Sequence, residues 1–360
     1  MDAAEKSQEA ISECVLLERC SGGSATLLVV FAAANARSFT FYNTTHGLPC
    51  DVLYVRDPRK NAWFQDGFLE PPGIEASVEF LRKLAAPYER VVVSGASMGG
   101  YAAILFGSRI GASLILALGP QTQLNHSYSR SPRRDVTLRE PDLSAVVAAS
   151  PPGQIHMMVG VLDAVDYFNV IRLADLGGAE VYCFEGEDHF LPKSLAKSEA
   201  LTRLFAAAVA GAALDPAPHA YVTRAGLDQA RCEMIRAVVP LMFEKRDYRS
   251  ARALVRPFLA AEPPWALAHY LWGASAFKDD LFGPAMRELK TAANMFPNSV
   301  DYNMLAAEAA LHTGDQTRAQ AFARRVLAVR SNNTRARAIV EGQMPAVESG
   351  AVALDEAPPE

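Results

Sequence analysis

The stretch "VVVSGASMGGYAAILFG", residues 91–107, constrains the fold of this chain more than any other segment. Its valine run predicts a buried strand, and its alanine-rich second half predicts the start of a helix. Only a sharp turn can join the two. Gly95 and Gly99 have no side chains to collide across such a turn, so Ser97 between them can adopt a strained conformation with its hydroxyl pushed outward. The sequence therefore predicts a strand–turn–helix unit with a serine at its apex.

Composition narrows the class of protein. The chain has 360 residues, of which 50% are hydrophobic and 21% charged, and its net charge is -5. This length predicts two domains, and the charge balance provides no basic surface for nucleic acid or an anionic membrane. The polar amino terminus does not resemble a signal peptide, and the longest apolar stretches are too short to span a bilayer. Five scattered cysteines without a CxxC pair predict neither disulfides nor a zinc site, so we expect a reduced, cytoplasmic setting.

Up to about residue 205, short β-rich runs alternate with stretches whose apolar residues recur at helical spacing. Strands that are apolar on both faces and alternate with helices predict an α/β domain, a mostly parallel sheet with helices on both faces. Ligands of such sheets lie beyond the carboxyl ends of the strands, and Ser97 follows one of these ends. The expected strands are 25–31, 51–56, 90–95, 112–118, 155–161 and 180–186, and the expected helices are 73–86, 100–110, 170–176 and 194–209.

A second periodicity follows in the last third of the chain. Ala251, Ala285 and Ala319 are spaced by 34 residues, and Pro263 and Pro297 share that spacing. A period of this length, with a small residue where two helices cross and a proline ending the second helix, is typical of tetratricopeptide (TPR) repeats. We therefore expect three helix pairs in an all-α repeat domain.

The predicted organisation has four parts. The α/β domain covers 1–210, with a cap-like insertion at about 119–154; a linker rich in small residues and proline covers 211–225; the repeats cover 226–342; and a disordered tail covers 343–360. The repeat domain carries no catalytic pattern. We expect it either to bind a protein or peptide partner in a shallow groove, or to be a stabilising appendage or dimerisation surface.

A serine hydroxyl reacts only with a base to take its proton, a carboxylate to orient the base, and donors for the oxyanion. His189 is the base candidate because it directly follows the last expected strand. Asp163 and Asp166 both follow the preceding strand. The Gly-x-x-Asp spacing after Gly160 favours Asp163 as the acid, with Asp166 as the alternative.

Residues 24–205 resemble an α/β-hydrolase, because the Gly-x-Ser-x-Gly turn between strand and helix and the order serine, acid, histidine are those of that family. The segments "GASMGGYAA" and "DPRKNAWF" further resemble bacterial hydrolase-like proteins, some of them linked to polysaccharide or surface glycoconjugate handling. The resemblance implies acyl transfer to or from Ser97, as an esterase, deacylase or acyltransferase acting on a carbohydrate or glycoconjugate ester. It implies neither a metal nor an organic cofactor. The alternative is a non-catalytic interaction protein whose hydrolase-like domain is idle.

The substrate-facing groups are expected in three places. The backbone N–H of Met98, directly after the serine, is the first oxyanion donor, and Ala33, in the loop after the first long strand, is the second, although the familiar His-Gly pattern is absent there. Trp63 and Phe64 are candidates to wall a substrate cleft, and the alternative for this aromatic pair, which we favour, is packing in the core. The cap segment carries four arginines that suggest an anionic substrate: Arg130, Arg133, Arg134 and Arg139.

Overall fold

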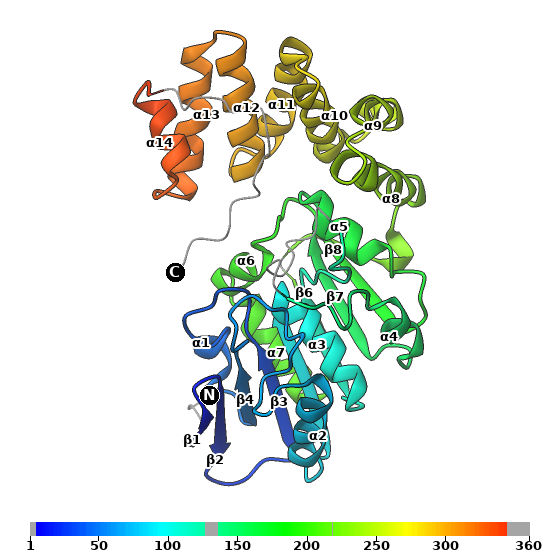
Figure 1. Ribbon diagram of the computed structural model, residues 1–360, viewed down its shortest axis with the longest axis vertical. Coiled ribbons are helices and arrows are strands. Elements are labelled where there is room, and N and C mark those ends of the chain that lie inside the picture. Colours follow the sequence, from blue (N-terminus) through cyan, green and yellow to red (C-terminus); the bar gives the residue numbers. More distant parts are fainter. Residues whose placement is uncertain (1–4, 127–135, 218, 344–360) are drawn as a thin grey trace. The chain divides into compact units, whose positions relative to one another are not determined.

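The computed structural model describes residues 5–126, 136–217 and 219–343 (Figure 1). The chain divides into two compact units, with the boundary between Leu227 and Asp228. The first unit is a nine-stranded, mostly parallel sheet with helices, and the second is all-helical, so the predicted fold class is confirmed. Three cap arginines, Arg130, Arg133 and Arg134, and the predicted tail beyond residue 343 lie outside the described residues.

The sheet of the first unit has the strand order β1-β2-β4-β3-β5-β6-β7-β8-β9. Its six central strands run parallel, and strands paired antiparallel lie at both edges. Aliphatic residues dominate the central strands because both faces of the sheet are covered. The strands are β1 (Lys6–Ser12), β2 (Val15–Cys20), β3 (Thr26–Phe31), β4 (Asp51–Val55), β5 (Arg90–Ala96), β6 (Leu114–Leu118), β7 (Ile155–Gly160), β8 (Ala179–Phe184) and β9 (Tyr221–Thr223).

Neighbouring residues of the central strands pack on opposite faces. On one face, Val92 belongs to a buried cluster that includes α7. On the other face, Val93 packs against α3: a Cβ added to Gly107 of that helix would lie 3.3 Å from the Cβ of Val93. The helices of this unit are α1 (Tyr42–Thr45), α2 (Ile74–Ala85), α3 (Met98–Arg109), α4 (Ser144–Ala149), α5 (Ala164–Ile171), α6 (Leu191–Lys197) and α7 (Ala200–Ala210).

The six parallel strands agree with the sequence prediction to within about two residues at each end, but other elements differ. Of the helix expected at 170–176, only Val170 and Ile171 are helical, because α5 covers Ala164–Ile171 and turns follow it. The helix expected at 194–209 is split because Glu199 adopts a left-handed conformation. The edge strands β1, β2 and β9 were not predicted. β9 lies within 211–225, the expected linker, and pairs with β8, so this segment belongs to the sheet.

Over its described residues, 228–343, the second unit contains three pairs of α-helices and a final α-helix. They are α8 (Gln229–Phe243) with α9 (Tyr248–Val255), α10 (Ala266–Lys278) with α11 (Phe282–Met295), α12 (Val300–His312) with α13 (Gln316–Val329), and α14 (Thr334–Val340). The alanines at the repeat spacing, Ala251, Ala285 and Ala319, all lie on the second helix of a pair and are fully buried. Among the described residues, no helix has both the length and the apolar character that a membrane crossing requires.

The closest approach within a repeat predicts where this unit is most sensitive. A Cβ on Gly273 of α10 would lie 2.7 Å from Cγ of Leu289 on α11. We expect Gly273→Ala to lower the free energy of unfolding by about 1–3 kcal/mol, because the added methyl group overfills the crossing. Gly283→Ala is the matched control, since its Cβ would meet nothing within 4 Å. Chemical denaturation of both variants checks this, and equal stability would contradict the packing described.

Candidate active site

Ser97 occupies the predicted turn between β5 and α3, in a strained backbone conformation. Its φ of 54° and ψ of -116° lie outside the ordinary regions for a residue with a side chain. Close backbone approaches on both sides explain the flanking glycines. A Cβ on Gly95 would lie 2.3 Å from the carbonyl oxygen of Gly99, and one on Gly99 would lie 2.2 Å from that of Phe31 at the end of β3.

The backbone of Ser97 is tied to the neighbouring strand. Its N–H donates to the carbonyl oxygen of Leu118, the last residue of β6, at 2.9 Å. The next residue, Gly119, donates in turn to Met158 of β7 at 2.7 Å. Ser97 therefore sits at the carboxyl edge of the sheet, against the Leu118–Gly119 corner.

His189 reaches the same edge from β8, because the loop that carries it crosses the end of β7. A Cβ on Gly160 would lie 2.4 Å from the carbonyl carbon of Glu187, and the N–H of Leu162 donates to the Glu187 carbonyl oxygen at 2.9 Å. Beyond this crossing, His189 lies next to the Leu118–Gly119 corner to which Ser97 is bonded. A Cβ added to Gly119 would lie 3.8 Å from Nδ1 of His189. The structure thus brings the predicted serine and histidine to one corner of one sheet edge.

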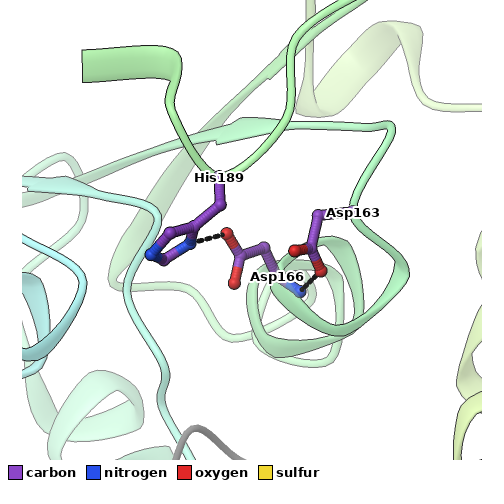
Figure 2. Close-up of side chains that lie close together, drawn as sticks. All are labelled: Asp163, Asp166 and His189. Atoms are coloured by element: carbon purple, nitrogen blue, oxygen red, sulfur yellow. Dashed lines mark hydrogen bonds and ion pairs between the residues drawn. The ribbon is translucent and has the colours of Figure 1, made fainter. Parts of the chain in front are cut away.

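The carboxylate partner of His189 is Asp166. Its Oδ2 lies 2.5 Å from His189 Nδ1, and its side chain is only 1% exposed (Figure 2). Asp163 instead caps α5, where its Oδ1 accepts from the N–H groups of Val165 at 2.9 Å and Asp166 at 3.0 Å. The preference for Asp163 is corrected, because α5 begins at Ala164: Asp163 takes the cap position and Asp166, in the first turn, faces the ring.

This pair has a definite chemical capacity. A buried carboxylate that accepts from Nδ1–H holds the imidazole in the tautomer whose Nε2 carries a lone pair. Figure 2 shows Nε2 on the far side of the ring from Asp166. The imidazole can therefore take a proton from a hydroxyl on that side while the carboxylate stabilises the resulting cation.

Asp163, Asp166 and His189 are also residue types that can bind a metal ion, and they lie close together. Each of the three residues offers one ligand atom, and these atoms lie within 4.8 Å of one another. Ligand atoms around a tetrahedral zinc ion lie about 3.3 Å apart, given bonds of about 2.0–2.1 Å. The separation of 2.5 Å between Nδ1 and Oδ2 fits a shared proton and not a shared ion. The geometry favours an acid–base pair.

The crossing of β7 by the His189 loop yields a prediction. We expect Gly160→Ala to lower catalytic turnover by about 100-fold, because a methyl group there collides with the Glu187–Asp188 backbone and moves the imidazole. Gly177→Ala, whose Cβ would meet nothing within 4 Å, is the control. Steady-state hydrolysis of p-nitrophenyl acetate by both variants checks the effect. Wild-type turnover by Gly160→Ala would show that the crossing does not fix His189.

The two expected oxyanion donors differ in availability. Met98 opens α3, so its N–H lies in the first helical turn, and it has no hydrogen-bond partner in the described part of the chain. The N–H of Ala33 donates to Thr40 Oγ1 at 3.0 Å. The expectation that Ala33 supplies an oxyanion donor is therefore corrected, because the Thr40 hydroxyl already accepts that proton.

Trp63 and Phe64 do not wall a cleft, because both side chains are 0% exposed. The Phe64 ring lies 5.2 Å from that of Phe31, and the Trp63 ring lies 5.8 Å from that of Tyr101. The loop that buries them turns around Asp57, whose carboxylate accepts from several of its backbone N–H groups. Burial raises the pKa of the Asp57 carboxyl, while these N–H groups oppose that rise. These aromatic residues belong to the core.

A buried amide, that of Gln65, bonds to the backbone of residues 139 and 140 in the predicted cap insertion, and no local sequence pattern indicates this contact. Gln65 Oε1 accepts from the N–H groups of Arg139 at 2.7 Å and Glu140 at 2.9 Å, and its Nε2 donates to the Tyr101 hydroxyl at 2.8 Å. The Arg139 guanidinium lies 3.5 Å from a carboxylate oxygen of Asp66. Of the four cap arginines, the described one is thus paired within the protein.

An open groove of about 500 Å³ lies elsewhere on this unit. Its lining includes Ser108 and Arg109, at the carboxyl end of α3, and Gln154, just before β7. Ser97 precedes the amino end of the same helix, whose 12 residues span about 18 Å. The groove is therefore separate from the Ser97 corner.

Comparisons with known proteins give distant structural likenesses. No protein-family model and no curated protein matches the sequence. The capsule O-acetyltransferase of Neisseria meningitidis serogroup A is 11% identical over 53% of this chain and 92% of that chain, with a TM-score of 0.41. Brefeldin A esterase, a bacterial homologue of human hormone sensitive lipase, is 18% identical over 58% of this chain and 78% of its own, with a TM-score of 0.38. PcrH from Pseudomonas aeruginosa is 20% identical over 33% of this chain and 95% of its own, with a TM-score of 0.29.

Proposed function

We propose that this protein is a serine hydrolase of the α/β-hydrolase type, acting as an esterase, deacylase or acyltransferase. Ser97 is the nucleophile, His189 the general base and then acid, and Asp166 the orienting carboxylate. The observation that carries the proposal is the 2.5 Å hydrogen bond between Asp166 and His189 at the sheet edge where Ser97 sits in a strained turn. Such a constellation is recognised by geometry and roles, not by sequence position.

The reaction follows from these roles. Nε2 of His189 takes the Ser97 proton as the oxygen attacks the ester carbonyl, and Asp166 stabilises the imidazolium that forms. The protonated imidazole then gives its proton to the leaving alcohol, which leaves an acyl group on Ser97. An accepting hydroxyl, from water or a second alcohol, then gives its proton to the same nitrogen as its oxygen attacks the acyl carbonyl. The bond between the acyl group and Ser97 Oγ breaks, and the imidazolium returns its proton to that oxygen.

The oxyanion formed in each step requires backbone donors. The N–H of Met98 serves as the first, supported by its position directly after the nucleophile and by the positive end of the α3 dipole. We assign the second to Ala34 in place of Ala33. The Ala34 N–H has no hydrogen-bond partner among the described residues, and it belongs to the loop after β3 that Gly99 contacts.

The substrate class and setting are inferred from the sequence motifs. The "GASMGGYAA" and "DPRKNAWF" segments support an ester of a carbohydrate or glycoconjugate as the substrate. The helical repeats of the second unit support binding of a protein or peptide partner. All five cysteines are free thiols, which supports a reduced, cytoplasmic location.

The alternative is an interaction protein with an idle hydrolase-like unit. The engagement of the Ala33 N–H by Thr40 favours it, because one expected oxyanion donor is occupied. An acyl-enzyme trap distinguishes the two proposals. The protein is mixed with p-nitrophenyl acetate, quenched in acid within seconds, digested and mapped by mass spectrometry. A hydrolase gives acetylation of Ser97, whereas an idle scaffold gives none at this residue beyond the level found in protein denatured before mixing.

A further inference from the structure

A short segment near the end of the first unit forms a strap along β8, the strand that leads to His189. This strap, residues 219–223, contains β9, in which Tyr221 is opposite Phe184 and Val222 is opposite Cys183 of β8. The ladder extends one step further, because the N–H of Glu185 donates to the carbonyl oxygen of Ala220 at 3.2 Å. The strap therefore reaches the first residue of the loop 185–189.

Side chains reinforce this contact. The Tyr221 ring lies 5.6 Å from the ring of Phe184 and 5.8 Å from that of Tyr182. His219 lies further along, with its ring 6.3 Å from that of Phe184 and its Nε2 3.9 Å from Oε1 of Glu187. Burial raises the pKa of the Glu187 carboxyl, and the Ser194 hydroxyl and then the His219 ring oppose that rise. Glu187 precedes His189 by two residues.

The loop is consequently held on two sides. On the β7 side, the Leu162 N–H holds the Glu187 carbonyl, and Gly160 lies beneath the same peptide. On the β9 side, the strap bonds to Glu185 through its backbone, and the His219 ring lies beside the Glu187 carboxylate. Loss of the contacts on the β9 side is therefore expected to loosen the loop that carries His189.

We propose that His219 and Tyr221 are positioning residues for His189, so that the segment joining the two units is part of the active-site scaffold of the first. This inference rests on the proposed function. Neither residue contacts the Asp166–His189 pair directly, and both act through the loop. A misplacement of about 1 Å at a reacting group can cost about 100-fold in rate, so a partial loosening is expected to be measurable.

The test uses single substitutions in the full chain. We expect His219→Ala and Tyr221→Ala to lower kcat for p-nitrophenyl acetate about tenfold, with KM within about twofold, because the proposed role of both residues is to place the His189 loop and not to contact the ester. Tyr221→Phe keeps the ring and is expected to retain wild-type kcat. Thr223→Ala, an exposed position on the same strand, is the matched control. His219→Ala combined with Glu187→Gln should cost no more than Glu187→Gln alone, because the two substitutions remove one shared contact.

A second readout separates this inference from the proposed function. The imidazole proton and nitrogen resonances of His189, assigned by NMR, report its environment whether or not the ester is hydrolysed. We expect them to shift or broaden in His219→Ala and Tyr221→Ala and to remain unchanged in Thr223→Ala. Wild-type resonances in both strap variants would overturn the positioning role. Altered resonances without any ester turnover by the wild type would uphold the strap and overturn the hydrolase.

Discussion

Replacement of Ser97 by alanine is expected to lower kcat for p-nitrophenyl acetate by about 10⁴-fold or more, because no other group can form the acyl intermediate. The folded structure should persist, since the turn depends on Gly95 and Gly99 and on the hydrogen bond from the backbone of residue 97 to Leu118. Steady-state kinetics measures the loss, and circular dichroism melting verifies the fold.

Ser108→Ala is the matched control for this substitution. Ser108 lies on the same helix near its other end, and its hydroxyl bonds to that of Ser150, away from the sheet edge. It is expected to retain wild-type turnover. Hydrolysis by Ser97→Ala at the wild-type rate would show that Ser97 is not the nucleophile.

Asp166→Asn is expected to lower kcat by about 10⁴-fold, because an asparagine amide donates where the carboxylate accepts and so favours the wrong imidazole tautomer. Asp163→Asn should leave kcat within about twofold of wild type. Asparagine is as good a helix cap as aspartate, so the start of α5 is preserved.

The two substitutions form a direct comparison within one helix turn. Each replaces a carboxylate with an amide of the same shape, and only one of the two carboxylates bonds to His189. Measurement of kcat for both variants on one ester decides between them. A larger loss of kcat in Asp163→Asn would show that Asp163 is the acid, as the spacing after Gly160 had favoured.

Local pattern was sufficient for much of the fold. The valine run before Ser97 and the glycines on either side of it predict the strained turn, because no longer-range information is needed to exclude side chains there. The parallel strands were equally visible, since strands covered on both faces are apolar throughout. The repeat unit followed from the spacing of its buried alanines.

Local pattern could not decide which carboxylate orients His189. The choice between Asp163 and Asp166 depends on whether α5 begins before or after them, a shift of one helical turn. The N-cap position of Asp163 was the available signal, since aspartate followed by a helical run is a common helix start.

Other misassignments arose from contacts that residue composition does not reveal. The Ala33 amide is occupied by a threonine seven residues away, and the aromatic pair Trp63–Phe64 is buried by a loop that turns around Asp57. β9 is only three residues long and is defined by its pairing with β8, which local composition does not reveal. Such pairings become visible only with the fold.

The central claim is that the Asp166–His189 pair activates the Ser97 hydroxyl, and the rate of phosphonylation by a fluorophosphonate probe tests it most directly. The second-order rate constant is measured for the wild type, Asp166→Asn and Asp163→Asn, with the adduct mapped to its residue by mass spectrometry. The account predicts an adduct on Ser97 that forms at least about 100-fold more slowly in Asp166→Asn and at the wild-type rate in Asp163→Asn. Equal rates in all three proteins, or an adduct on another residue, would contradict it.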